Sequence, residues 1–89
     1  MTKRKFLANF KNNKIIFADQ EEVEEFKMLL KEFDIKCSTI TFNYQRDYYK
    51  ITGSQGKYVC LYGQKMASQK RKYKQFNKLM EKVMGESDE

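Results

Sequence analysis

The chain has 89 residues, 40% of them hydrophobic and 15% aromatic, with a formal net charge of +6. Such a length suits one domain, and a disordered chain would hold fewer aromatic residues. No apolar run approaches the roughly 20 residues that a transmembrane helix needs, so we expect no membrane partner. The basic residues Lys3–Lys5 are not followed by the hydrophobic stretch of a signal peptide, and we therefore expect a cytoplasmic protein.

The residue types that most often carry out catalysis are scarce. Histidine is absent, which removes the most frequent general base and the commonest metal ligand. The two cysteines, Cys37 and Cys60, cannot by themselves complete a tetrahedral zinc site, and they are too few for a disulfide framework. Gly53–Lys57 lacks the spacing of a phosphate-binding loop. We therefore expect a protein that is not an enzyme and that holds no metal and no cofactor.

Charge is distributed unevenly along the chain. Residues 1–18 hold five basic groups and no acid, residues 19–34 have a net charge of −5, and residues 35–63 have +3. Residues 64–85 have a net charge of +6, and residues 86–89 have −3. Such asymmetry indicates the kind of partner rather than the fold.

The N-terminal residues alternate between apolar and polar. In Lys5–Phe10 the residues at even positions are apolar, which is the period of a half-buried strand. Ile15–Ala18 reads as a second strand, and Asn12 with Asn13 suits a tight turn because asparagine tolerates a positive φ. The sequence therefore predicts a β-hairpin at the N-terminus.

A helix is predicted to begin at Asp19. Asp19 can accept hydrogen bonds from the first turn, and Glu22 stands at the position of a capping box. The acids that follow suit the positive end of a helix dipole. The apolar residues recur at helical spacing and form one stripe. These are Val23, Phe26, Leu29, Leu30 and Phe33.

Residues 36–62 are predicted to form a three-stranded meander. Ile40, Phe42 and Tyr44 alternate with polar residues in the first strand. The second strand is Tyr48–Thr52 and the third is Lys57–Tyr62. The residues between them, from Gly53 to Gly56, contain two glycines, which is a hairpin signal.

A second helix is predicted from about Gln64 or Ser68 to Met84, with Gly85 ending it. One side of it is apolar, with Tyr73, Phe76, Leu79, Met80, Val83 and Met84. The opposite side is basic, with Arg71, Lys74, Lys78 and Lys82. The predicted fold is a small single α+β domain of order β-β-α-β-β-β-α. It has an antiparallel sheet with two helices on one face, over residues 1–85, and a frayed acidic tail at residues 86–89.

Over about residues 19–84 this element order resembles that of double-stranded RNA-binding domains. Ser68–Lys74 is similar to the lysine-rich start of that family's second helix, although the spacing differs and an extra N-terminal hairpin precedes the region. A three-stranded meander followed by a helix also resembles small domains that lay a sheet in the DNA major groove. Neither resemblance assigns a family.

The leading functional hypothesis is a non-enzymatic accessory protein that binds DNA or RNA electrostatically, with a phage or mobile element as its suggested origin. Lysine and arginine along one helix face neutralise phosphates, the main source of affinity for nucleic acid. The expected phosphate contacts are Lys65, Lys70, Arg71, Lys74, Lys78 and Lys82, with Arg46, Lys50 and Lys57 as secondary contacts. Tyrosines of the meander could stack on unpaired bases, although tyrosine is also common in strands for structural reasons. They are Tyr44, Tyr48, Tyr49, Tyr58 and Tyr62.

Two alternatives stay open. In the first, the chain is a protein-binding inhibitor or adaptor, such as a phage-encoded inhibitor of a host nucleic-acid enzyme. It would place its basic surface on an acidic host protein, or its acidic first helix in a nucleic-acid channel. In the second, the chain is a homodimer or larger homo-oligomer that pairs exposed strand edges, with Phe6–Phe10 or Ile15–Ala18 as candidates.

Overall fold

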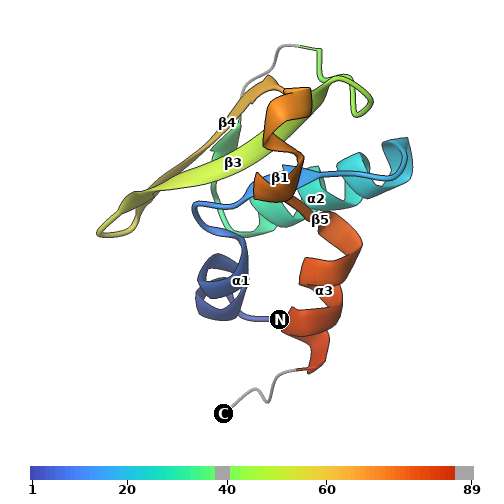
Figure 1. The fold of residues 1–89 in the computed structure, drawn as a ribbon. Helices are drawn as coiled ribbons and strands as arrows, with labels where there is room; N and C mark the ends of the chain where they lie inside the picture. The colour runs from blue at the N-terminus through green and yellow to red at the C-terminus, as the bar shows by residue number, and fades with distance from the viewer. Residues whose placement is uncertain (38–40, 86–89) are drawn as a thin grey trace.

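The computed structural model describes residues 1–37 and 41–85, with principal extents of 38 × 25 × 23 Å. Within these two ranges, three α-helices gather on one side of a five-stranded sheet, and the β3–β4 hairpin projects from the body of the molecule (Figure 1). The elements are α1 Lys3–Phe10, β1 Lys14–Ile16, α2 Gln20–Glu32, β2 Lys36–Cys37, β3 Asp47–Ser54, β4 Lys57–Gln64, the 3₁₀ helix η1 Ala67–Lys72, β5 Tyr73–Gln75 and α3 Phe76–Gly85. The predicted α+β class is confirmed. The predicted acidic tail, residues 86–89, lies outside the described residues.

The sheet is mixed, so the prediction of an antiparallel sheet is only partly right. Its strand order is β2-β4-β3-β1-β5. The inner pairs, β1 with β3 and β3 with β4, are antiparallel. The outer pairs, β1 with β5 and β2 with β4, are parallel. Among the described residues, no helix is long and apolar enough to cross a bilayer.

The predicted strand Lys5–Phe10 is wrong, because these residues form helix α1. Thr2 caps the helix by accepting a hydrogen bond from the Lys5 backbone nitrogen at 3.2 Å. Phe6 and Phe10, four residues apart, lie on one helical face with their rings stacked at 4.6 Å. Ala8, which alternation would place beside them, is exposed. Two large rings at helical spacing therefore outweigh the weak alternation.

Helix α2 follows its prediction closely. Asp19 is the N-cap and accepts from the Glu22 backbone nitrogen at 3.0 Å. The Glu22 carboxylate in turn accepts from the Ala18 backbone nitrogen at 2.9 Å. The pattern is that of a capping box, with its return bond made one residue before the N-cap. Val23, Phe26 and Leu30 are buried along the predicted stripe.

The hairpin of the predicted meander is confirmed, but its first strand is wrong. β3 and β4 pair from Asp47↔Gln64 to Ser54↔Lys57, and the turn residues Gln55 and Gly56 have φ of 53° and 82°. Residues 41–46 are not a strand. The Asp47 carboxylate accepts from the Asn43 nitrogen at 3.0 Å and closes a turn there instead. Ile40 lies outside the described residues.

The second predicted helix divides into three elements, η1, β5 and α3. Tyr73 has an extended backbone, with φ −92° and ψ 143°. The segment it begins pairs in parallel with β1, where Ile15 lies opposite Lys74. Tertiary pairing thus overrides local helical preference at these residues. Only from Phe76 onward does the helix form.

The core lies between the sheet and the three helices. Phe26 of α2 lies 5.8 Å from Phe76 of α3 and 5.4 Å from Phe17, measured between ring centroids. Tyr49 and Ile51 of β3 close the core from the sheet side. Of the predicted apolar stripe of α3, three residues are buried, Phe76, Leu79 and Val83, whereas Met84 is 70% exposed.

Candidate nucleic-acid interface

Three of the predicted phosphate contacts line one groove. Lys74 of β5 and Lys78 and Lys82 of α3 meet residues of α1 and of the turn that follows it. We call this hollow of about 530 Å³ the basic groove. Its other lining residues are Ala8, Asn9, Asn13, Tyr73, Gln75 and Leu79. None of these described lining residues is acidic, so no carboxylate among them compensates the lysines.

The lysines reach the groove from two elements. Lys78 and Lys82 are one helical turn apart on α3, where the buried residues Leu79 and Val83 anchor the helix to the core. Lys74 is placed by the parallel pairing of β5 with β1. The predicted single helical stripe is therefore wrong. Arg71, which belonged to that stripe, is exposed on η1 instead and does not line the groove.

A second hollow lies where the chain crosses from β4 to β5. We call it the crossover pocket; it measures about 350 Å³. Its lining residues are Ile16, Lys65, Met66, Ala67, Lys70 and Tyr73. Tyr73 lines the basic groove as well, so the two hollows lie next to each other at this residue of β5.

Two of the predicted cations are already bound within the protein. The Lys65 ammonium donates to the backbone oxygens of Tyr44 at 2.6 Å and Gln45 at 3.3 Å. The Arg46 guanidinium pairs with the Asp47 carboxylate at 3.0 Å. That hydrogen bond holds the pKa of the Asp47 carboxyl below its ordinary value. Lys65 and Arg46 thus stabilise the turn before β3. The charge of Arg46 is largely compensated by the Asp47 carboxylate.

The other predicted secondary contacts lie away from the groove. Lys50 of β3 stands opposite Leu61 of β4, and Lys57 stands opposite Ser54 at the tip of the hairpin. Lys50 alternates along β3 with the buried residues Tyr49 and Ile51, so its side chain lies on the sheet face that turns away from the helices. The nine predicted contacts are therefore divided among several surfaces.

Sequence reasoning missed Lys14. Its ammonium donates to the Gln69 side-chain oxygen at 3.0 Å and lies 5.2 Å from the ring centroid of Tyr48 and 5.9 Å from that of Tyr73. The rings of Tyr48 and Tyr73 are 5.5 Å apart. No local pattern in the sequence indicates this cluster, because it depends on β1 lying between β3 and β5.

The predicted tyrosine cluster is divided by the sheet. Tyr49 is buried in the core. Tyr58 lies on the helix side, with the ammonium groups of Lys3 and Lys11 at 5.8 and 5.4 Å from its ring centroid. Tyr48 is on the opposite face, beside Tyr73. A continuous five-tyrosine surface for stacking does not form.

The cysteines lie side by side on β2 and β4. Cys37 and Cys60 are opposite each other in the parallel register, and no disulfide joins them. The neighbouring Cys37 thiol, together with burial, raises the pKa of the Cys60 thiol. A raised pKa keeps the sulfur protonated and poorly nucleophilic. Within the described parts of the chain, no group of histidine, cysteine and acidic residues could hold a metal ion.

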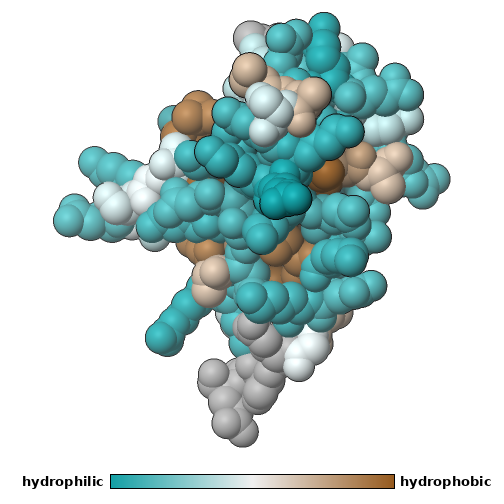
Figure 2. Space-filling model, viewed as in Figure 1, coloured by the Kyte–Doolittle hydropathy of each residue, from teal (hydrophilic) through white to brown (hydrophobic). Residues whose placement is uncertain are grey.

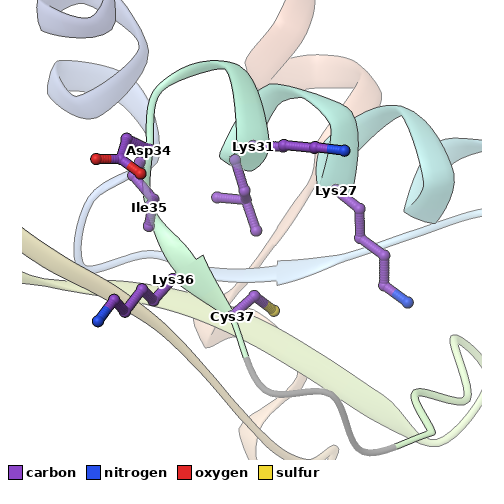
Figure 3. A pocket seen from close by; sticks show the side chains of 7 residues that line it. Lys27, Lys31, Asp34, Ile35, Lys36 and Cys37 are labelled. Atoms are coloured by element: carbon purple, nitrogen blue, oxygen red, sulfur yellow. The ribbon is translucent and has the colours of Figure 1, made fainter.

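A third hollow, of about 360 Å³, lies where α2 leads into β2. Figure 3 shows that Lys36 extends away from Lys27 and Lys31, and Asp34 stands at the rim. The three ammonium groups do not converge on a common point. We therefore assign no anion site to this hollow.

The surface formed by η1, β5 and α3 is mainly hydrophilic, with hydrophobic side chains reaching it in separate places (Figure 2). The basic groove and the crossover pocket belong to these same elements. Comparisons with protein families, with curated proteins and with solved structures find no match.

Proposed function

We propose that the chain is a non-enzymatic nucleic-acid-binding protein that holds a phosphate backbone in the basic groove. One observation carries the proposal: Lys74, Lys78 and Lys82 come together from a strand and a helix without any acidic residue among the described lining. Cations that converge on a concave surface attract phosphates more strongly than the same number scattered over a flat one. Neutralised phosphates release their counterions, which supplies affinity for any sequence.

The position of the nearest acid supports the same proposal. Glu81 is the only acidic residue of residues 64–85. It does not line the basic groove, and instead lines a hollow of about 410 Å³ beside α2, with Glu22 and Glu25. Glu81 follows Lys78 by three residues and so lies beside the basic side of α3, but it lines the neighbouring hollow rather than the groove. A helix that served only solubility would more often mix the two signs.

Salt dependence of binding tests the proposal. The slope of log affinity against log salt should be close to −0.9 per neutralised phosphate on duplex DNA and about −0.7 on single strands. In the double variant Lys74→Gln/Lys78→Gln, we expect weaker binding to all sequences and a slope reduced by about two units. Fluorescence anisotropy with labelled DNA and RNA would measure both quantities.

The matched control removes the same charge from another surface. Lys27 and Lys31 are also four residues apart, but they line the hollow in which the lysines do not converge. Lys27→Gln/Lys31→Gln should retain affinity close to that of the unmodified protein. Equal losses in the two double variants would mean a diffuse charge effect rather than a site. A lack of any binding at low salt would overturn the proposal.

A protein-binding inhibitor or adaptor remains the second candidate, and one observation favours it. The hollow between α2 and α3 combines Met80 and Met84 with three carboxylates, those of Glu22, Glu25 and Glu81. Flexible methionines adapt to varied apolar partners, and the carboxylates would suit a basic peptide. If nucleic acid does not bind, titration with a basic amphipathic peptide tests this surface directly.

A further inference from the structure

The crossover pocket is built differently from the basic groove. Its walls are four apolar or aromatic side chains, those of Ile16, Met66, Ala67 and Tyr73. Its charged lining residues are the lysines Lys65 and Lys70. With a volume of about 350 Å³, it falls in the usual range for small-ligand sites, roughly 300–1,000 Å³. A hollow of this kind suits a flat apolar group next to a negative charge.

The aromatic wall of the pocket is held in place from several sides. The Tyr73 hydroxyl accepts a hydrogen bond from the Met66 backbone nitrogen at 2.7 Å. The ring lies 5.5 Å from that of Tyr48 and 5.9 Å from the Lys14 ammonium. Gln69, to which Lys14 donates, ties the same cluster to η1. A ring fixed in this way loses little conformational freedom when a second ring packs against it.

The two lysines have different capacities for a ligand. The Lys65 ammonium is already bonded to the backbone oxygens of Tyr44 and Gln45. Lys70 is exposed on η1, at the mouth of the pocket. Lys70 is therefore the lysine placed to meet a phosphate. The pocket also adjoins the basic groove, since Tyr73 lines both.

We infer that the crossover pocket accepts one unpaired base of a single-stranded nucleic acid. The base packs against Tyr73 and Met66, and its flanking phosphate lies beside Lys70. The inference rests on the proposed function, because a strand held at Lys74 in the basic groove passes β5 next to the pocket. Aromatic stacking with lysines along the backbone is how sequence-tolerant single-strand binders work.

Two consequences follow from the chemistry of the lining. A base paired within a duplex cannot leave its stack without a cost, so single strands are preferred over duplexes. Apart from the lysines and the tyrosine hydroxyl, the described lining offers no polar side chain to a base edge. Every base has a flat face, so the preference for unpaired nucleotides extends to all four bases.

Filling the pocket without changing the charge tests the inference. Ala67 is exposed and lines the pocket, so Ala67→Phe should fold normally and occupy the space of the base. Affinity for ten-nucleotide oligothymidylate and oligouridylate should fall on the order of 5- to 150-fold, the equivalent of one stacked base. Affinity for a ten-base-pair duplex should stay unchanged. The two oligonucleotides also decide whether DNA and RNA are bound alike.

Ser68 supplies the matched control. It is exposed, next to Ala67 in η1, and outside the pocket lining, so Ser68→Phe adds a similar ring without filling the hollow. This variant should bind oligothymidylate as the unmodified protein does. An abasic strand of the same length, which keeps the phosphates and lacks the bases, should bind the unmodified protein as weakly as oligothymidylate binds Ala67→Phe.

The outcomes separate the two proposals. If the unmodified protein binds neither duplex nor single strand at low salt, the proposed function itself is wrong. If it binds both, and Ala67→Phe leaves oligothymidylate binding unchanged, the base pocket is wrong and the basic groove stands. Equal losses for Ala67→Phe and Ser68→Phe would also overturn the pocket, because they would reflect a disturbed η1.

Discussion

Ile15 and Lys74 lie opposite each other in the parallel strands β1 and β5, although they come from distant parts of the chain. Ile15 is completely buried, whereas Lys74 is exposed and lines the basic groove. The buried Ile15 thus holds in place the strand with which the candidate binding residue Lys74 is paired. The position of the candidate site depends on this long-range pairing as much as on the charge of the residues that form it.

The first prediction concerns the shared core of α2 and α3. Phe26 and Phe76 are 0% and 2% exposed, and truncation of either to alanine leaves a large cavity. We expect each to lower the free energy of unfolding by about 3–5 kcal/mol, enough to unfold a domain of this size. Thermal and urea denaturation would measure the loss. As a control, Met84→Ala should change stability little, because that side chain is 70% exposed. An unchanged melting temperature for Phe26→Ala would contradict the described core.

The second prediction concerns Gly53 and Gly56, at the turn end of the β3–β4 hairpin. Gly53 has φ +137°, and a β-carbon there would overlap the carbonyl oxygen of Lys57. Gly56 has φ +82° with open space around it, so alanine meets only the backbone cost of a positive φ, about 1 kcal/mol. Gly53→Ala should therefore destabilise the protein more than Gly56→Ala. Urea denaturation of the two variants measures the difference in their free energies of unfolding. Equal losses of stability would contradict the close approach of Gly53 to Lys57.

Acid denaturation should depend on Asp47. Its side chain is buried, it accepts hydrogen bonds from the Arg46 side chain and the Asn43 backbone nitrogen, and the bond from Arg46 lowers its pKa. The stability it contributes is therefore present above the ordinary carboxyl pKa of about 3.9 and is lost as pH falls through the lower folded value. Asp47→Asn should be less stable at neutral pH and should lose less stability on acidification. Asp34→Asn, at an exposed carboxylate, should retain the acid sensitivity of the unmodified protein.

Helix α2 and the β3–β4 hairpin could be predicted from local patterns, whereas helix α1, the start of α3 and the sheet could not. The capping residues Asp19 and Glu22 and the stripe behind them are local features, so α2 was predicted correctly. The same holds for the glycine-containing turn at Gly56. At Tyr73, however, the basic and apolar residues continue a helical pattern, while the backbone is extended. Its pairing with β1 is a tertiary contact that no spacing in the sequence encodes.

The candidate site was predicted in composition but not in arrangement. The sequence shows that residues 64–85 are basic, and the structure places three of their lysines, Lys74, Lys78 and Lys82, along the basic groove. Arg46 and Lys65 could not be recognised as structural, because Asp47 and the backbone oxygens that bind them are placed by folding. Lys14 was missed for the same reason, since its neighbours Tyr48 and Tyr73 come from other strands.

The cysteine pair should make the protein less stable at high pH. The pKa of Cys60 is raised by Cys37 and by burial, so its contribution to stability is complete below the ordinary thiol pKa of about 8.5. That contribution is lost as pH rises above this value. Urea denaturation from neutral to alkaline pH should show a fall that is smaller in Cys60→Ala. A thiol reagent should modify Cys60 only after the protein unfolds. As a control, the exposed thiol introduced by Ser68→Cys should react at once. Fast reaction of Cys60 in the folded protein would contradict its protonated, buried state.

The last prediction separates a structural lysine from a binding one. Lys65 bridges the backbone oxygens of Tyr44 and Gln45, whereas Lys70 is exposed at the mouth of the crossover pocket. Lys65→Met keeps most of the aliphatic stem and loses charge-assisted hydrogen bonds, so we expect a loss of about 1–3 kcal/mol in stability. Lys70→Met removes the same charge from a solvated position and should change stability by less than about 0.5 kcal/mol.

Binding should respond in the opposite order. Lys70→Met should weaken single-strand binding and reduce the salt slope by about one unit, whereas folded Lys65→Met should bind nearly as the unmodified protein does. Chemical denaturation and anisotropy on the same two variants would test both halves. If Lys65→Met lost binding while keeping its stability, the Lys65 ammonium would contact phosphate rather than the backbone of the preceding turn. If Lys70→Met left single-strand binding unchanged, the assignment of Lys70 as the phosphate contact would be wrong.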